Sequence, residues 1–328
     1  MSCDVSELMD KLVAINLLEA VMSEDLKVLN KQAIAAARRH MGEVAWLTVA
    51  LTAFVVVAFI ANLVLYAQGV LPTWLAFTAM AVLTYFSYTP LHEAAHRNIN
   101  GNNEKLAKLN DLCGYLVAPM IAVPYASHRL EHFTHHRYTN QEGKDPDFVI
   151  SGLGQGWIRA VAAVFQFFWT QNTFFVFHHW SKATLKERVV YGLEISFSIG
   201  WRVAVISWIA QPWIAFVVLG GYLVGAFFTA YWFAYRPHLP YQEPRRYKNT
   251  NSLIMPTWMK PFEWFWLGQN LHSIHHLFPR VPFYRYHALH REIEPILRAH
   301  GTPIIGVYSR KAVPPRETTA PQDLNVRC

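Results

Sequence analysis

Four long apolar runs constrain the fold more than any other feature of the chain. They cover approximately residues 44–67, 72–89, 191–210 and 212–235. Each run is close to the roughly 20 residues that a helix needs to cross the hydrocarbon of a bilayer. The composition agrees, because 53% of the residues are hydrophobic and only 16% are charged, whereas about a quarter are charged in soluble domains. The sequence therefore predicts an all-α integral membrane protein with four transmembrane helices.

The links between these runs predict two helical hairpins. Residues 68–71 separate the first two runs, and Gln211 separates the last two. Arg202 lies inside the third run, where a charge is costly unless it finds a partner. Two further apolar stretches, 112–125 and 157–177, are interrupted by prolines and polar residues. We expect these two stretches to be interfacial or re-entrant helices, because broken backbone at membrane depth needs cover from protein or water.

The chain divides into three predicted segments. Residues 1–43 have apolar positions at helical spacing, typical of an amphipathic helix at the membrane interface or of a soluble helical hairpin. Residues 44–290 form the membrane domain, and residues 291–328 form a C-terminal tail. The acidic residues near the N-terminus argue against a secretory signal. The three cysteines have no paired spacing, which fits a reducing compartment.

Charge predicts the orientation of the helices. The links at 68–71 and Gln211 contain no Lys or Arg, whereas the segments on the other side are rich in both. By the positive-inside rule, the termini and the long segments face the cytoplasm, as in a multi-pass protein of the inner membrane. The net charge of +7 does not predict nucleic-acid binding, because the basic residues are not gathered with aromatics on one element.

Three histidine clusters fall on the predicted cytoplasmic side. They read HEAAH, HFTHH and HSIHH, and each follows or lies between the apolar runs. Residues spaced i, i+3 and i+4 share one face of a helix, so each cluster directs its imidazoles one way. The eight histidines are His92, His96, His132, His135, His136, His272, His275 and His276.

The number of histidines predicts two metal ions. A single zinc site takes three or four protein ligands, so eight imidazoles suit two ions with about four nitrogens each. A site at the edge of a bilayer meets hydrocarbon substrates, and attack on an unactivated C–H bond requires oxygen activated at a redox metal. Zinc has no redox chemistry. Two irons, with O₂ as co-substrate, are therefore the predicted cofactors.

Three stretches carry a resemblance to a known family. They read HFTHHRYTNQEGKDPD, YRPHLPYQEPRRYKN and GQNLHSIHHLFPRVPFYRYH. The pattern resembles the membrane fatty acid desaturase/hydroxylase superfamily, whose three histidine boxes bind a di-iron centre, and within it most closely the desaturase-like β-carotene hydroxylases. The resemblance implies iron ligation by the eight box histidines and by a ninth, His238. It also implies an external electron donor such as ferredoxin, because the chain has no HPGG haem-binding segment of a fused cytochrome b5 domain.

The predicted function follows from that resemblance. We expect hydroxylation of a carotenoid β-ionone ring with O₂ and external electrons. The alternative is a fatty acyl desaturase or hydroxylase, which would use the same ligands on another lipophilic substrate. A more remote alternative is a membrane zinc metalloprotease, because HEAAH also satisfies HExxH, with Glu93 as general base. That reading leaves the other two boxes without a role.

Four further residues are candidates to support the ligands. Asp145 and Asp147 of KDPD either accept hydrogen bonds from box histidines or form a turn and cap the next helix. Asn270 either contacts a ligand or caps a helix. His128 lies one turn before His132 and shares its face, and we expect it to support the site without binding metal.

Overall fold

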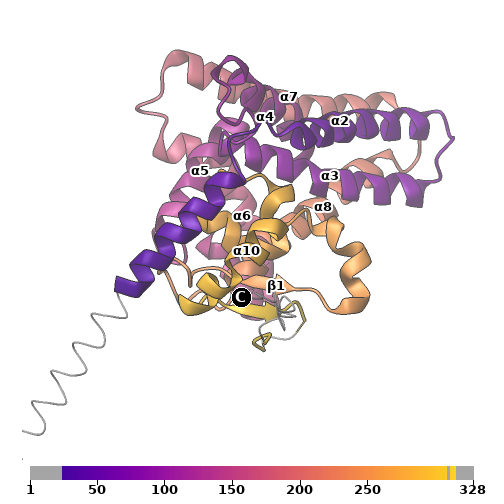
Figure 1. Cartoon of the computed structure of the whole chain (residues 1–328). Coiled ribbons are helices and arrows are strands. Elements are labelled where there is room, and N and C mark those ends of the chain that lie inside the picture. Colours follow the sequence, from indigo (N-terminus) through magenta and orange to yellow (C-terminus); the bar gives the residue numbers. More distant parts are fainter. Residues whose placement is uncertain (1–23, 309–310, 315–328) are drawn as a thin grey trace, which may run out of the picture.

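The computed structural model describes residues 24–308 and 311–314. It is mostly helical, with two long helical hairpins and a cap of shorter elements (Figure 1). The first 23 residues of the predicted N-terminal segment, and residues 315–328 of the predicted tail, lie outside the described part. The fold class expected from the sequence is confirmed.

The first hairpin consists of α2 (Trp46–Ala67) and α3 (Thr73–Ala95). α2 is apolar along its whole length. Only 28% of its most apolar stretch is buried, so most of the helix faces outward, as a lipid-exposed helix would. Within the hairpin, the buried Asn62 donates a hydrogen bond to the Ala76 carbonyl at 3.0 Å. The last turns of α3 are buried and carry the first histidine cluster into the protein.

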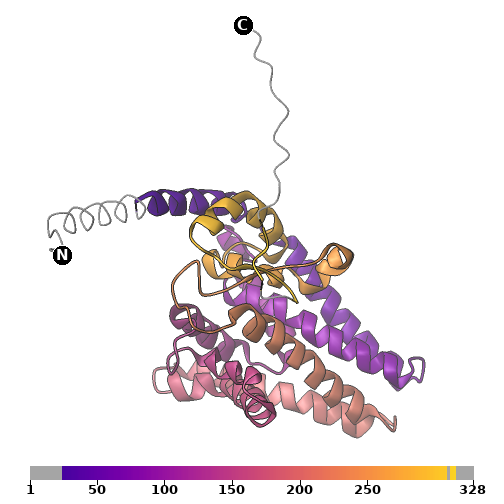
Figure 2. The same ribbon diagram turned by 90° about the horizontal axis from the view of Figure 1, so that it is seen from below.

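The second hairpin joins α7 (Leu185–Trp208) to a continuous helical segment over 216–238. That segment contains η3 (Phe216–Gly220), α8 (Gly221–Thr229), η4 (Ala230–Tyr235) and η5 (Arg236–His238). Seen from below, the two hairpins extend in the same direction (Figure 2). α8 crosses α3 closely at Gly225, where a Cβ would lie 2.3 Å from the Ala81 carbonyl oxygen. Only glycine permits this approach of the two backbones.

Four helices have the length and composition of membrane spans: α2, α6 (Trp157–His178), α7 and the segment 216–238. The stretch 157–177 was expected to be interrupted, but α6 is one uninterrupted helix of 22 residues. Arg159 and Gln166, which interrupt the apolar run, leave the backbone intact because neither is a proline. The run 72–89, expected as the second span, is not among these four, because the second half of α3 carries the polar residues that build the histidine site.

The stretch 112–125 is bent, as expected for a re-entrant or interfacial segment. α4 (Lys108–Ile121) and α5 (Tyr125–Tyr138) meet at an angle of 96°. The break falls at Ala122, which has a left-handed φ of 54°, and Pro124 follows it. This bend turns α5, with the second histidine cluster, beneath the hairpins.

Arg202 of α7 has partners in the bilayer region. Its guanidinium donates to the carbonyls of Pro119 at 2.9 Å and Met120 at 2.9 Å, and to Ser198 of its own helix. The last carbonyls of a helix have no partner within the helix, so the arginine satisfies the end of α4. The charge that the sequence left unexplained therefore holds two helices together.

The cap contains one small sheet besides its helices. β1 (Ser252–Ile254) pairs in parallel with β2 (Ile304–Gly306). Among residues 24–308 and 311–314, this short sheet and an isolated bridge between Ile305 and Ala312 are the departures from an all-α chain. The other cap elements are η1 (Glu104–Leu106), η2 (Pro146–Gly154), η6 (Thr257–Trp266), η7 (Gln269–Leu271), α9 (His272–Leu277), η8 (Phe283–Arg285) and α10 (Tyr286–Ala299).

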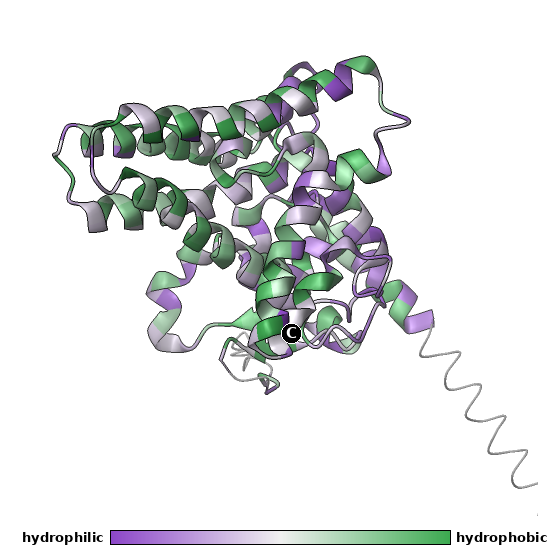
Figure 3. Ribbon diagram, turned by 180° about the vertical axis from the view of Figure 1, so that it is seen from behind, coloured by the Kyte–Doolittle hydropathy of each residue, from purple (hydrophilic) through white to green (hydrophobic). Residues whose placement is uncertain are grey.

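The core of the cap extends past the predicted domain boundary at 290. Ile293 and Leu297 of α10 are buried in the same cluster as Ile274 of α9. Residues 24–39 form a helix that contributes Ala33 and Ala37 to this cluster. The cap therefore takes in residues from both sequence ends. Figure 3 shows hydrophobic residues dominating the hairpins, and hydrophilic segments gathered at the opposite end of the molecule.

Candidate metal centre

Nine histidines from four elements meet where the hairpins join the cap. α3 contributes the first cluster at its C-terminal end, α5 contributes the second, η5 contributes His238, and α9 contributes the third. Every histidine of the three boxes points into this common region, and seven of the nine are buried. The structure thus brings together all nine of the residues expected as ligands, across a sequence separation of 184 residues between His92 and His276.

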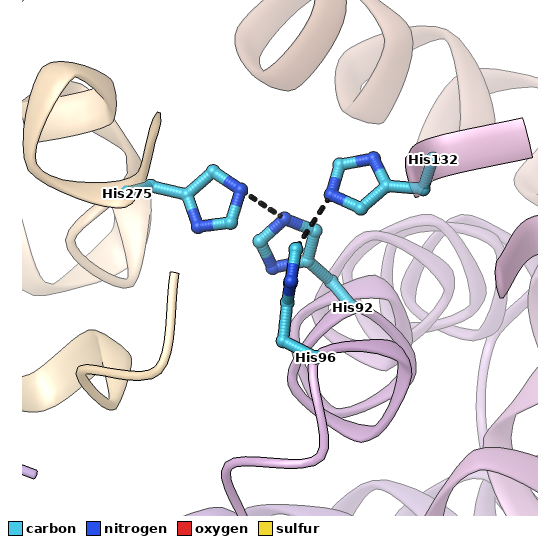
Figure 4. Close-up of side chains that lie close together, drawn as sticks. All are labelled: His92, His96, His132 and His275. Atoms are coloured by element: carbon cyan, nitrogen blue, oxygen red, sulfur yellow. Dashed lines mark hydrogen bonds between the residues drawn. The ribbon is translucent and has the colours of Figure 1, made fainter. Parts of the chain in front are cut away.

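The first group comprises His92, His96, His132 and His275, whose ligand nitrogens all lie within 4.8 Å of one another. Figure 4 shows the four rings approaching from three elements. The Nε2 atoms of His92 and His275 are 2.9 Å apart, and those of His96 and His132 are also 2.9 Å apart. All four side chains are buried.

The second group comprises His135, His238 and His276, whose ligand nitrogens also all lie within 4.8 Å of one another. The ring of His272 lies beside them, with its centroid 4.8 Å from that of His276 and 5.2 Å from that of His238. His136 sits between the groups, because its Nε2 is 2.8 Å from Nε2 of His275 and its ring stacks on His276 at 4.3 Å.

Hydrogen bonds alone do not account for these contacts. Nε2 of His136 lies within 3.1 Å of Nε2 in both His132 and His275, and those two nitrogens in turn approach His96 and His92. A neutral imidazole nitrogen offers one proton or one lone pair, so a chain of five nitrogens cannot satisfy all four contacts. Ions that accept lone pairs from several rings at once would satisfy them. The donor set therefore fits metal.

The histidines of α9 are held in the neutral form that binds metal. Burial lowers the pKa of His272 to about 3, with further lowering by His135 and His96. Burial and the neighbouring imidazoles also bring the pKa of His275 and of His276 well below the usual value. Since a neutral imidazole keeps a free lone pair, these rings are prepared as ligands at neutral pH.

Asp145 combines the two roles that the sequence left open. Its carboxylate accepts a hydrogen bond from Nδ1 of His135 at 2.8 Å, which leaves Nε2 of that ring directed at the other histidines. The same carboxylate accepts from the backbone amides of Asn140 at 2.7 Å and Asp147 at 2.9 Å, so it also caps η2. Asp147 lies 3.7 Å from Nδ1 of His135 and accepts from Gln171 at 3.0 Å.

Three residues that hold ligand rings were not singled out from the sequence. The hydroxyl of Tyr286 lies 3.1 Å from Nδ1 of His275, Oε1 of Gln269 lies 3.3 Å from Nδ1 of His272, and Oδ1 of Asn140 lies 3.3 Å from Nδ1 of His238. Such contacts orient a metal-binding imidazole and fix its tautomer. All three residues stand within the stretches that carry the family resemblance, which was the available signal.

His128 lies beside the first group and is not part of it. Its ring stacks on that of His132 at 5.1 Å, and its Nδ1 is 3.4 Å from Oε1 of Gln171. Gln171 also donates to Asp147, so these residues link α6 to α5 and η2. The supporting role expected of His128 stays a prediction. The same network includes the buried Glu131 carboxylate, 4.0 Å from His128.

Asn270 does not contact a box histidine among the described residues. Its amide donates to the Leu253 carbonyl at 3.2 Å and to the Glu263 carboxylate at 3.0 Å. The sequence suggested that Asn270 contacts a ligand histidine. Its hydrogen bonds instead join η7 to β1 and η6. Asn270 precedes α9 by two residues, and its side chain points toward β1.

Glu93 faces away from the histidines. Its carboxylate accepts from the Thr48 hydroxyl at 2.6 Å, the Asn98 amide at 3.1 Å and the Phe283 backbone amide at 2.8 Å. A general base of a zinc protease must point at a metal-bound water, whereas this side chain ties α3 to α2 and the cap. The HExxH reading is therefore wrong in its essential residue.

Comparison with known proteins agrees with this geometry. Residues 68–308 match the family model described as fatty acid desaturase. Over 261 residues, the chain is 24% identical to the chloroplastic omega-6 fatty acid desaturase of Brassica napus, covering 68% of this chain and 54% of that protein. The corresponding protein of Arabidopsis thaliana is 23% identical, with coverage of 68% and 53%.

The family match covers well over half of the chain and includes every histidine of the centre. The chain spans about half the length of the curated relatives it matches. The matched family is one of oxidoreductases, and the four long apolar helices are those of a multi-pass membrane protein. The chain belongs to the fatty acid desaturase family.

Proposed function

We propose that the protein is a membrane di-iron enzyme that desaturates a fatty acyl chain with O₂ and external electrons. The observation that carries this proposal is the convergence of nine imidazoles in two groups where the apolar hairpins end. The named relatives are fatty acid desaturases, so they support the acyl alternative better than the carotenoid reading. A lipophilic substrate also suits a centre at the base of membrane helices.

The two groups of histidines assign the proposed ligands. His92, His96, His132 and His275 would hold one iron, and His135, His238, His272 and His276 would hold the other, with His136 between them. When bound, the iron pair supplies the redox chemistry that O₂ activation requires and that zinc lacks. The remaining contributions come from the protein.

The chain places an apolar wall against the first group. The ring of Tyr88 packs on Phe233 at 4.5 Å and lies 5.7 Å from the ring of His92, while Phe233 lies 6.1 Å from the same histidine. In our proposal, these rings position the substrate methylenes beside the centre and exclude water. Holding the reacting carbon at a fixed distance and angle decides between hydroxylation and desaturation.

The carotenoid ring remains a second candidate substrate. It is favoured by the three stretches around the second box, His238 and the third box, which resemble β-carotene hydroxylases. Both substrates are long and apolar, and both reactions would use the same ligands. We further propose that the centre faces the cytoplasm, since Lys and Arg are gathered on its side of the hairpins.

The test is expression of the chain in cells that accumulate β-carotene, followed by analysis of pigments and fatty acids from one culture. We expect new double bonds in the lipid acyl chains, with pigments unchanged. Hydroxylated pigments with unaltered lipids would favour the carotenoid candidate and contradict the acyl proposal. The His135→Ala variant is the matched control and should show neither product, since it removes a ligand whose Nδ1 is already fixed by Asp145.

A further inference from the structure

The histidine cluster approaches the surface at one edge. Of the nine histidines, His136 and His276 are partly exposed, and the other seven are buried. The rings of these two stack with centroids 4.3 Å apart, and each lies against a buried member of the cluster. Any path for electrons between solvent and the centre is therefore shortest through this pair.

Four segments surround that edge: 96–102, 136–144, 243–249 and 276–281. Hydrogen bonds join them into one surface. Arg280 donates to the Gly101 carbonyl at 3.2 Å, and Arg246 donates to the Leu277 carbonyl at 3.4 Å. Asn140 at the end of α5 donates to the carbonyls of Glu243 and Asn249 at 3.0 and 2.8 Å. We call these four segments the basic rim.

The basic rim carries an excess of positive charge. The four segments contain seven cationic side chains and only two carboxylates outside Asp145, those of Glu142 and Glu243. Glu243 is ion-paired with Arg245. The next carboxylate along the chain, Asp145, is buried against His135. The cationic residues are Arg97, Arg137, Lys144, Arg245, Arg246, Lys248 and Arg280.

Two of these cations form no side-chain hydrogen bond or ion pair within the described residues. Arg97 directly follows His96, and Arg137 directly follows His136. Both are exposed, and neither forms a side-chain hydrogen bond or ion pair with another residue in 24–308. An exposed arginine without a hydrogen bond or ion pair to the described residues is available to a partner.

We propose that the basic rim is the docking surface for a small acidic one-electron carrier protein, which delivers electrons to the centre past His136 and His276. The inference rests on the proposed function. Reduction of O₂ to two waters takes four electrons and four protons. Desaturation of a CH₂–CH₂ unit supplies two of each, so two electrons must come from another molecule, and two protons from solvent. Hydroxylation also requires two external electrons.

Charge complementarity favours an acidic protein as the occupant. A positive surface around the electron entry point steers a negative partner and orients it for transfer. The rim is built from loops and helix ends that follow α3 and α5, precede β1 and close α9. An anionic lipid surface is the competing occupant, and the experiment must separate the two.

The experiment compares two double charge reversals in the full-length chain in neutral-lipid nanodiscs. Arg97→Glu/Arg137→Glu alters the rim, whereas Lys31→Glu/Lys182→Glu makes the same change in net charge at exposed sites on other segments. The probe is an oxidised plant-type [2Fe–2S] ferredoxin, and its Kd is measured in metal-free and iron-loaded protein over a range of salt concentrations. We expect about tenfold weaker binding for the rim variant, a shallower salt dependence, and little change for the control.

Reduction kinetics provide a second readout. Reduction of the iron-loaded protein by the ferredoxin should slow about tenfold in the rim variant, while reduction by dithionite should stay unchanged. Equal ferredoxin binding by wild type and rim variant, or no binding by wild type, overturns the docking proposal. Loss of binding to vesicles containing phosphatidylglycerol, with ferredoxin binding intact, would identify a lipid site and also overturn it. If dithionite finds no reducible iron even in wild type, the proposed function fails together with the docking proposal.

Discussion

At the scale of single residues, the centre depends on side chains that hold the ligands as much as on the ligands. Nδ1 of His135 donates to Asp145, and Nδ1 of His275 lies within hydrogen-bond distance of Tyr286. Each contact fixes which nitrogen of the ring is free to bind metal. The surroundings of the ligands therefore set the direction of the lone pairs.

Asp145→Asn tests this support. The amide keeps the shape of the side chain but removes the charge that His135 and the cap of η2 both use. We expect iron affinity to fall about 10- to 100-fold, measured by competition with a chelator. Glu142→Gln is the matched control, because that carboxylate is exposed nearby and should leave the affinity unchanged. Equal affinities in the two variants would show that Asp145 does not support the site.

The sequence predicted the ligands better than it predicted their supports. The spacing of the boxes and the resemblance around PHLP singled out the nine histidines that the structure brings together, because imidazoles at i, i+3 and i+4 share a helix face; their binding of metal stays a prediction. Asn140, Gln269 and Tyr286 were missed because their contacts depend on how η5, η7 and α10 pack. Asn270 shows the reverse case, since a polar residue close to a box turned to β1.

At the scale of elements, α7 forms hydrogen bonds to both the end of α4 and the start of α5, on either side of the bend between them. Arg202 binds the last carbonyls of α4, and eight residues earlier Glu194 accepts from the backbone amides of Tyr125 at 2.6 Å and Ala126 at 3.2 Å. Glu194 thus satisfies amides at the start of α5 that have no partner within that helix. The orientation of the second histidine box is set by a helix that contributes no ligand.

Arg202→Leu should therefore destabilise the protein. It removes a buried guanidinium that donates to three backbone carbonyls, and buried hydrogen bonds to charged groups contribute about 1.5–3 kcal/mol each, without being additive. We expect a loss of about 2–4 kcal/mol, measured as a lower thermal midpoint in detergent. Arg159→Leu on the exposed face of α6 is the control. A midpoint unchanged by Arg202→Leu would mean that the α4 end needs no partner.

The position of α7 could not be derived from the sequence. The apolar run predicted its existence, and Arg202 signalled that a partner was needed. The identity of the partner required the bend at Ala122, which places Pro119 and Met120 beside the arginine. α6 was likewise expected to be broken, but Arg159 and Gln166 are tolerated on an uninterrupted helix because their side chains need not disturb its backbone.

At the scale of the whole molecule, the apolar hairpins and the polar cap have different roles. α3 and the segment 216–238 end at the histidines, and the cap closes the site with α9. Fold class followed from composition and run length, which are properties of the whole chain. The two-stranded sheet did not, since its strands lie 50 residues apart and have three residues each.

Metal stoichiometry tests the central claim most directly. Full-length protein purified without added metal should contain two irons per chain by plasma mass spectrometry, and His275→Ala, which removes a nitrogen of the first group that also lies 2.8 Å from Nε2 of His136, should hold markedly less. One zinc per chain, no bound metal, or an iron content that does not respond to loss of His275 would contradict an enzyme built around a histidine-bound pair of irons.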